Sequence, residues 1–378
     1  MASRKMNVLA AAALLAAAGV TAARAPGSSA AQLGTPIATL ESATTITFAA
    51  DTDSNSPSVW SLVSGRPYLY VLNSVAGRST QSRGLSVDRL APLAAIKWSP
   101  AAPHGGAWIE AIVPDPAGSN WYGYYHNERE DVVCPGTGKV VPRIGAARSS
   151  DRGLTWRDLG TVIEAPPGTE RCDTFNHYFV GGVGDFTAIL DKDQQYLYFY
   201  YTQYFEKNSE VGVAVARMTW ANRNSPANKA TVWNAGAWLP GSTQRVLQPD
   251  GRTVNQFVHR SATPVPKARD SWDGGTPAVD VFWGPSVHWN TALGMYVMLL
   301  NRATSAEWAQ EGTYVSYSPK LDDPRAWSPP IKLLGGGSWY PQVIGLQAGG
   351  TDREAGELAR FFVGGRSQHL VRFSREEP

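Results

Sequence analysis

One pattern of hydrophobic and polar positions recurs five times along the chain. Each copy begins with a short aliphatic run after a polar or Pro position, passes through a turn, and continues in an aromatic-rich run. The copies begin at Ser56, Ile109, Gly184, Gly284 and Tyr340. Repetition at intervals of this size indicates a radial or stacked architecture in which each copy is one supersecondary unit. The equivalent starts of the copies are therefore expected to converge on one axis.

The runs within each copy have the character of β-strands. A third run follows in each copy, and the alternation of residues 214–220 has the period of two that half-buried strands show. Residues 37–50 form a further strand-like run without a copy of their own, while the last copy is short. We expect this run to complete the last sheet and close the ring, because open sheet edges invite aggregation.

The pattern thus predicts an all-β fold, a five-bladed β-propeller of four-stranded antiparallel blades closed by an N-terminal strand. Residues 37–378 would form this single domain. The alternative is an open β-sandwich whose repeats are coincidental. Two of the intervals between copies are long, and they place insertions at about residues 127–143 and 222–282.

Composition narrows the choice of partner. Aromatic residues make up 11% of the 378 residues, charged residues only 17%, and the net charge is +2. The basic residues form no run or stripe, which argues against nucleic acid. A neutral oligo- or polysaccharide fits this aromatic, weakly charged chain better, and we expect a monomer that does not bind membranes.

The first 25 residues have the features of a signal peptide. Arg4 and Lys5 precede the apolar run 8–20, and Ala23 and Ala25 supply the small residues that a signal peptidase reads. The apolar run is too short to span a bilayer. We therefore expect export to the periplasm or the extracellular space, with residues 26–36 as a flexible segment.

The two cysteines, Cys134 and Cys172, are predicted to form a disulfide, because an even pair in an exported protein is typically bonded. The chain-entropy model gives such a bridge on the order of 4 kcal/mol. Two sulfurs this far apart do not predict a metal site.

Residues 149–156 match the pattern S-x-D-x-G-x-T-W, which resembles the Asp-box of sialidases and other propeller proteins. In such a turn Asp151 accepts hydrogen bonds from backbone amides, Gly153 takes a positive φ, and Trp156 packs into the sheet. We interpret Asp151 as structural. A sialidase activity is disfavoured, because the early Arg-Ile-Pro motif of sialidases is absent.

As a set, the five repeats resemble the five-bladed propeller glycosidases, the arabinanase, β-xylosidase, fructosidase and levansucrase group. This resemblance implies carboxylates at the starts of the innermost strands, around a central cavity. Asp185, in Gly-Val-Gly-Asp-Phe, fits that pattern best, Glu110 has the corresponding place in the second copy, and Asp53 lies just before the first. Glycoside hydrolysis needs two carboxyl groups that flank the scissile bond.

The fourth copy departs from the family pattern, because Trp283 stands where the acid before Gly284-Pro285 is expected. The proton would then come from another carboxyl group on the same face of the ring. Glu128 and Glu311 are the candidates, at the end of a second strand and the start of a third. The predicted catalytic set is Asp53, Glu110, Asp185, Glu128 and Glu311.

Further residues map to the same face and suit sugar hydroxyls or stacking. Arg302 would suit an anionic group, and His288 could face either the cavity or a neighbouring blade. Each single residue also has a structural interpretation, since an Asp before a strand is commonly a turn residue and a Trp is commonly core. The predicted substrate-binding residues are Asn55, His126, Trp283, His288, Asn301, Arg302 and Tyr340.

The sequence therefore predicts an exported glycoside hydrolase that acts through a ring of carboxylates. The alternatives are a non-catalytic glycan-binding propeller and a structural or interaction propeller. No cofactor is required for the hydrolysis, although hard oxygen ligands on the axis would suit a calcium ion.

Overall fold

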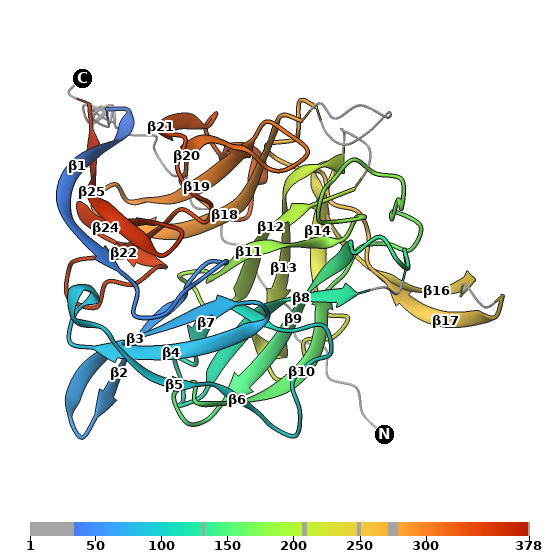
Figure 1. Ribbon diagram of the computed structural model, residues 1–378, viewed down its shortest axis with the longest axis horizontal. Helices are drawn as coiled ribbons and strands as arrows, with labels where there is room; N and C mark the ends of the chain where they lie inside the picture. Colours follow the sequence, from blue (N-terminus) through green and yellow to red (C-terminus); the bar gives the residue numbers. More distant parts are fainter. Residues whose placement is uncertain (1–33, 131–132, 206–209, 248–250, 271–278, 377–378) are drawn as a thin grey trace, which may run out of the picture.

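The computed structural model of the chain describes residues 34–130, 133–205, 210–247, 251–270 and 279–376 (Figure 1). The predicted signal peptide and nearly all of the predicted flexible segment lie outside these ranges. None of the helices in the described residues has the length and apolar character that crossing a bilayer requires.

The strands of the described residues form five sheets of four or five strands each, arranged as blades around an axis (Figure 1). Blade 1 contains β2 (Ser58–Val63), β3 (Arg66–Val75), β4 (Arg78–Gly84) and β5 (Ala91–Ala95). Blade 2 contains β7 (Trp108–Pro114), β8 (Trp121–Glu130), β9 (Val140–Ser149) and β10 (Thr155–Ile163), with β6 (Lys97–Trp98) at its edge. Blade 3 contains β11 (Val183–Leu190), β12 (Tyr196–Gln203), β13 (Gly212–Thr219), β14 (Thr231–Asn234) and β15 (Ala237–Pro240).

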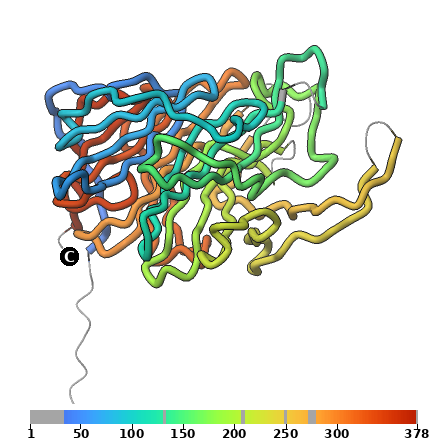
Figure 2. Tube along the Cα trace, turned by 90° about the horizontal axis from the view of Figure 1, so that it is seen from below, coloured from blue at the N-terminus to red at the C-terminus, as the bar shows by residue number. Residues whose placement is uncertain are grey.

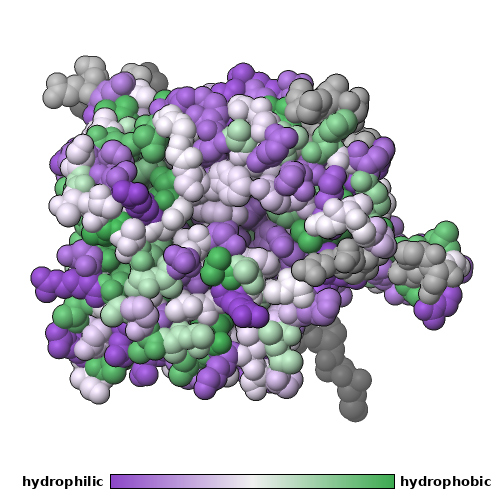
Figure 3. All heavy atoms as spheres, in the orientation of Figure 1, coloured by the Kyte–Doolittle hydropathy of each residue, from purple (hydrophilic) through white to green (hydrophobic). Residues whose placement is uncertain are grey.

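The remaining strands make two more blades and one separate hairpin. Blade 4 contains β18 (Val281–Asn290), β19 (Met295–Ala303), β20 (Gln310–Ser318) and β21 (Ile331–Gly335), with β23 (Glu354–Ala355) beside β18. Blade 5 contains β22 (Gln342–Gly345), β24 (Leu358–Val363), β25 (Arg366–Arg375) and β1 (Pro36–Thr47). The hairpin of β16 (Ser242–Leu247) and β17 (Thr253–Val258) projects from the ring, as Figure 2 shows. Both polar and apolar side chains cover it in Figure 3, and Leu247 is 70% exposed.

Closure of the ring confirms the prediction made for the N-terminal run. β1 pairs antiparallel with β25, from Pro36 opposite Arg375 to Thr47 opposite Arg366. The first and last blades also meet near the axis, where the Ser56 amide donates to Oε1 of Gln342 at 2.6 Å. The fold is therefore the predicted five-bladed β-propeller.

The blades pack through apolar cores because alternate side chains of a strand point to opposite faces. On β12, Phe199 belongs to the core between blades 2 and 3, while Tyr198 and Tyr200 belong to the core between blades 3 and 4. A middle strand buried on both faces explains the uninterrupted aromatic run of each repeat.

The innermost strands of blades 2, 3 and 4 each carry a β-bulge near their start. The pairing register shifts between Ile109 and Ala111 in β7, between Gly184 and Phe186 in β11, and between Trp283 and Ser286 in β18. A bulge frees its residue from the ladder and changes the direction of its side chain. Glu110 and Asp185 stand in the first two of these bulges.

Some backbone amides in the bulges and near the axis are not bonded within the sheet. Side chains of the preceding blade accept hydrogen bonds from these amides. Such pairing is expected, because a buried amide without a partner costs as much as a lost hydrogen bond. The bonds run from Ile109 N to Ser74 Oγ (3.1 Å), from Phe186 N to Glu110 Oε2 (2.7 Å) and from Gly284 N to Thr202 Oγ1 (2.9 Å).

Two predicted substrate-binding residues, Asn55 and Asn301, contact the backbone of this axial structure and are not among the residues that line the cavity. Asn55 donates through Nδ2 to the carbonyl oxygens of Phe186 (3.0 Å) and Pro285 (3.1 Å). Nδ2 of Asn301 lies 3.3 Å from the carbonyl oxygens of both Trp283 and Gly284. The Nδ2 groups of both residues thus contact backbone carbonyl oxygens.

The turn at residues 149–156 has the local structure expected from its sequence. Ser149 Oγ accepts from Gly153 N at 2.9 Å, and Asp151 Oδ1 accepts from Thr155 N at 2.8 Å. Gly153 has a φ of +82°, and Trp156 is fully buried with its Nε1 donating to the Gly153 carbonyl. The turn joins β9 to β10, far out in the blade, so its role is structural.

His288 faces the neighbouring blade, which is one of the two placements that the sequence allowed, and it is not among the residues that line the cavity. Its ring is fully buried on β18 and lies 5.3 Å from the ring of Phe373 in blade 5. Neither of its ring nitrogens has a hydrogen-bond partner among the described residues. Burial lowers the pKa of His288 from 6.5 to about 3, so the folded protein holds it neutral.

This burial predicts that His288 destabilises the fold in acid. Between pH 6.5 and about 3 the unfolded chain binds a proton at this position and the folded chain does not, so stability falls as the pH falls below 6.5. The effect amounts to about 2 kcal/mol at pH 5. Thermal unfolding of His288→Leu should show a smaller loss of Tm between pH 7 and pH 5 than the wild type.

Phe373→Leu is the matched control, because it disturbs the same contact without removing a titratable group. It should lower Tm by a similar amount at both pH values. An equal pH dependence in His288→Leu and the wild type would contradict the assignment.

Candidate active site

A cavity of about 220 Å³ opens near the bulges, at the end of the ring where the innermost strands of blades 2, 3 and 4 begin. Four carboxyl groups line it, together with one histidine and a wall of aromatic side chains. No Lys or Arg is among the described residues that line it. The lining residues are Asp53, Trp108, Glu110, His126, Glu128, Gly138, Val140, Tyr178, Phe179, Asp185, Trp283, Trp308, Trp339 and Tyr340.

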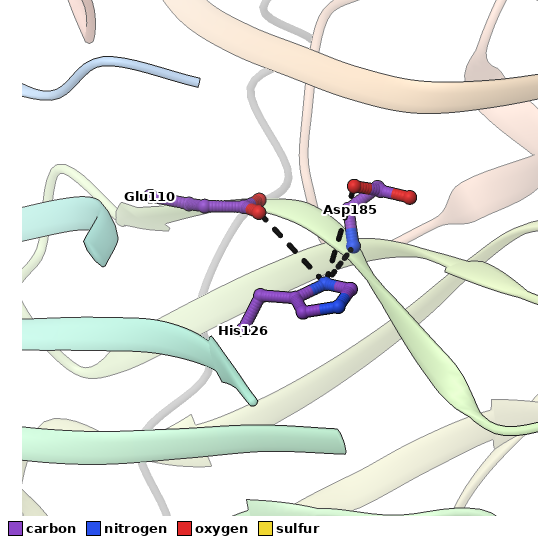
Figure 4. Close-up of side chains that lie close together, drawn as sticks. All are labelled: Glu110, His126 and Asp185. Atoms are coloured by element: carbon purple, nitrogen blue, oxygen red, sulfur yellow. Dashed lines mark hydrogen bonds and ion pairs between the residues drawn. The ribbon is translucent and has the colours of Figure 1, made fainter. Parts of the chain in front are cut away.

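Glu110, His126 and Asp185 form the innermost group of this cavity (Figure 4). The imidazole Nδ1 of His126 lies 3.9 Å from Oε1 of Glu110 and 3.9 Å from Oδ1 of Asp185. Nε2 of His126 faces Oε1 of Glu128 at 3.3 Å. β7, β8 and β11 thus bring three carboxyl groups around one buried imidazole.

The position of one proton of His126 follows from its hydrogen bonds. Nδ1 accepts from the backbone amide of Asp185 at 3.1 Å, so this nitrogen uses its lone pair and the proton lies on Nε2, toward Glu128. Burial opposes the charged form, but Glu128, Asp185 and Glu110 outweigh it and raise the pKa of His126 to about 9. A second proton would have to displace the amide of Asp185 from Nδ1. We therefore assign the neutral tautomer to the observed geometry.

Glu110 is the carboxyl group whose protonation the site favours most. Burial and the nearby charge of Asp185 raise the pKa of Glu110 well above its usual value. The Phe186 amide occupies Oε2, which leaves Oε1 to carry the proton. Glu110 is therefore the carboxyl group of this cavity that takes up a proton most readily.

Asp185 is held by two tyrosines. Tyr204 donates its hydroxyl to Oδ2, and Tyr340 donates to Oδ1 at 3.2 Å. Burial raises the pKa of Asp185, while the neighbouring His126 imidazole and the hydroxyl of Tyr204 oppose this rise. Asp185 also has a φ of +40°, which Asp tolerates better than most residues. The strained backbone points to a position fixed by its surroundings.

Asp53 lies at the rim of the cavity and keeps contact with solvent. Oδ1 accepts from Nε1 of Trp108 at 2.7 Å, and Oδ2 accepts from the Ala76 amide at 3.1 Å. The surrounding walls desolvate the carboxylate and raise the pKa of Asp53, although both hydrogen bonds act against this rise. Asp53 is thus a fixed carboxylate that water can reach.

Two further predicted residues, Arg302 and Glu311, are not among the residues that line the cavity. Arg302 donates two hydrogen bonds to the carboxylate of Asp280, at 2.7 and 2.8 Å, so its guanidinium is already paired with an anion. Glu311 binds Lys332 and accepts from the hydroxyl of Tyr314 at 2.7 Å. Arg302 is thus paired just before β18, and Glu311 is paired with Lys332 on the outer strand β21.

The remaining predicted residues do meet in one cavity. Asp53, Glu110, Glu128 and Asp185 line it, together with His126, Trp283 and Tyr340. Their roles in catalysis or binding stay predictions.

Sequence reasoning missed most of the aromatic wall. Trp108 lies two residues before Glu110, a spacing that could have suggested a shared location. Tyr178 and Phe179 come from the loop between β10 and β11, where the sequence carries no signal of their destination. Cys134 and Cys172 form a disulfide in this region, as predicted.

The innermost group could in principle hold a metal ion, because one ligand atom each of Glu110, His126 and Asp185 lies within 4.8 Å of the others. The lone pair of Nδ1 is already bound to the Asp185 amide, and Phe186 N binds Glu110. On the axis, the carbonyl oxygens of Phe186 and Pro285 are bound by Asn55. Nδ1 of His126, Oε2 of Glu110 and the two axial carbonyl oxygens thus already accept hydrogen bonds, and we derive no metal chemistry from them.

Comparison with known proteins finds no matching family model and no matching curated protein. Solved structures with a similar chain path include the exo-β-1,3-galactanase from Phanerochaete chrysosporium, at 12% identity and a TM-score of 0.46, over 88% of this chain and 64% of that one. They also include the endo-arabinase from Bacteroides thetaiotaomicron, at 10% identity and a TM-score of 0.45, over 88% and 97%. A thermostable family-43 glycoside hydrolase has 12% identity and a TM-score of 0.45, over 87% and 92%. The chain thus spans less than two thirds of the galactanase. The strand pairing defines the fold, and the cavity is the basis for the function proposed below.

The two tyrosines predict a measurable effect on Asp185. The hydroxyl of Tyr204 stabilises the charged form of Asp185, so Tyr204→Phe should raise the pKa of Asp185. Isotope-edited infrared titration of ¹³C-labelled aspartate carboxyls measures this shift. Tyr201→Phe, which changes a tyrosine of the core between blades 2 and 3, should leave it unchanged. The same Asp185 titration in Tyr204→Phe and the wild type would contradict the assignment.

Proposed function

We propose that the protein is a glycoside hydrolase that acts on an uncharged glycan in this cavity. The observation that carries the proposal is the meeting of four carboxyl groups, in different environments, beside an aromatic wall. Two carboxyl groups with different protonation states are what glycoside hydrolysis requires.

Glu110 would be the general acid. Asp185 and burial keep it protonated, and its free Oε1 can donate to the leaving glycosidic oxygen. Asp53 would be the base, because it combines fixed hydrogen bonds with contact to solvent. In the overall reaction the bond between the anomeric carbon and the leaving oxygen breaks. Water supplies the new hydroxyl group, and its remaining proton passes to Asp53 as the proton of Glu110 leaves with the aglycone.

Asp185 and Glu128 would act through their neighbours. The charge of Asp185 raises the pKa of Glu110, and Glu128 faces the protonated nitrogen of His126. Neither group then needs to touch the reacting atoms.

The walls suit a neutral sugar ring. Trp108, Trp283 and Tyr340 offer apolar faces, and the described lining residues include no Lys or Arg to neutralise an anionic substrate. Nε1 of Trp283 is buried and has no hydrogen-bond partner among the described residues, so it is a donor available to a hydroxyl group.

A non-catalytic glycan-binding protein is the second candidate. It is favoured by Trp283, which stands where the resemblance to propeller glycosidases places an acid. The same cavity would then bind a sugar without turnover.

We also propose that the protein is exported. The support is the signal-like N-terminal sequence together with the disulfide, because disulfides persist in oxidising compartments.

The hydrolase assignment predicts that Glu110→Gln and Asp53→Asn each lower kcat/KM by about 10²- to 10⁴-fold, the usual contribution of general acid–base catalysis. Turnover should be measured on aryl glycosides, linear arabinan, β-1,3-galactan and xylan. Glu311→Gln is the control and should retain activity, because Glu311 lies outside the cavity. Sugar binding without turnover by the wild type would favour the second candidate, and unchanged turnover in both variants would refute the assigned roles.

The link between Asp185 and Glu110 predicts a shift in the pH profile. The charge of Asp185 raises the pKa of Glu110, so Asp185→Asn should lower that pKa. Activity needs the protonated acid, and the alkaline limb of kcat/KM should therefore move to lower pH.

Asp191→Asn is the control for this shift, since Asp191 directly follows the opposite end of β11. It should leave the alkaline limb in place. An unchanged limb in Asp185→Asn, or one moved to higher pH, would contradict the role of Asp185.

A further inference from the structure

One wall of the cavity is built by a segment that crosses between blades. Residues 174–180 belong to the connection from β10 to β11. On the blade 2 side, Val140 N donates to the Tyr178 carbonyl at 3.0 Å and Val180 N donates to the Val140 carbonyl at 3.1 Å. The segment therefore extends the edge of the β9 strand like a short parallel partner.

The same segment is fastened to blade 4. His177 N donates to the carbonyl of Ala306 at 3.2 Å, and Nε1 of Trp308 donates to Oδ1 of Asn176 at 3.2 Å. Asn176 is buried, and its Oδ1 also accepts from the amides of Tyr178 and Phe179, both at 3.0 Å. The segment is thus tied at both ends.

A covalent bond and ring contacts hold the crossing segment in place. The disulfide joins Cys172, just before the segment, to Cys134 in the loop between β8 and β9. The ring of Phe179 stacks on Tyr204 at 4.5 Å, and Tyr178 lies edge-on to Trp339 at 6.1 Å. Tyr178 and Phe179 line the cavity, so the fastened segment is one of its walls.

The volume of the cavity limits the size of the ligand that it can bind. Pockets that bury drug-sized ligands usually have about 300–1,000 Å³. The cavity here has about 220 Å³, which suits a single sugar ring rather than several units of a chain. A glycan chain that extended from both sides of the bound sugar residue would meet the wall formed by Tyr178 and Phe179.

We propose that this wall makes the protein exo-acting: it accepts one terminal sugar residue of a glycan and releases it as a monosaccharide. The proposal rests on the glycoside hydrolase function above. Tyr178 and Phe179, held in place by the disulfide and by Asn176, determine this specificity, with Tyr178 at the point where an extended chain would leave.

The test is the product pattern on linear arabinan and β-1,3-galactan. Chromatography of early digests gives the ratio of monosaccharide to oligosaccharides, and viscometry reports internal cleavage. The wild type should release monosaccharide while viscosity falls slowly. Oligosaccharides blocked at the terminal sugar should resist cleavage.

Two variants open the wall in different ways. Tyr178→Ala shortens a side chain that is 40% exposed, and the double variant Cys134→Ser/Cys172→Ser releases the covalent anchor. Each should raise the share of oligosaccharide products severalfold. Phe175→Ala is the matched control, because Phe175 lies in the same segment, is 45% exposed and does not line the cavity. It should keep the wild-type products.

The outcomes separate this proposal from the one on which it rests. Turnover by the wild type that yields mixed oligosaccharides and a rapid fall in viscosity would overturn exo action and leave the hydrolase function intact. Monosaccharide products that stay unchanged in both opened variants would overturn the role of the wall. The absence of turnover on every glycan would overturn both proposals.

Discussion

The β-bulges at the starts of the innermost strands are the constraint on which the site depends. Each bulge takes backbone amides out of the ladder near the axis, where a buried amide must find another partner. The preceding blade supplies that partner as a side chain: Ser74, Glu110 and Thr202 each accept from the next blade. The ring closed by β1 and β25 keeps these junctions in register. The same hydrogen bonds therefore join neighbouring blades and fix the positions of the central side chains.

Glu110 shows how this constraint produces chemistry. The bond from Phe186 N fixes one of its oxygens and buries the carboxyl group next to Asp185. Two carboxyl groups so close in a poorly solvated site do not ionise together readily, and their coupling favours a proton on one of them. The tyrosines that bind Asp185 favour its charged form, so the proton falls to Glu110. The difference between acid and base then follows from hydrogen bonds that the fold itself needs.

The repeats in the sequence were sufficient to predict the number of blades and the closing strand, because strand periodicity is a local signal. The even pair of cysteines was sufficient to predict the disulfide. They also placed Glu110 and Asp185 correctly, since both stand at the repeat's own reference position. Distance from the axis was harder to predict. Glu311 and Arg302 occupy equivalent positions along their strands, yet Glu311 binds Lys332 on the outer strand β21 and Arg302 binds Asp280 just before β18. Tyr178 and Phe179 could not be predicted, because their positions depend on bonds to Val140 and Ala306 that no periodic pattern encodes.

The central claim is that one cavity at the bulges binds the sugar at which the reaction occurs. The most direct measurement is a crystal structure of Glu110→Gln soaked with a short oligosaccharide of a glycan that the wild type cleaves. The account predicts a terminal sugar ring between the aromatic wall and the carboxyl groups, with the glycosidic oxygen within hydrogen-bond distance of residue 110. Sugar bound elsewhere on the propeller, with this cavity empty at saturating concentration, would contradict it.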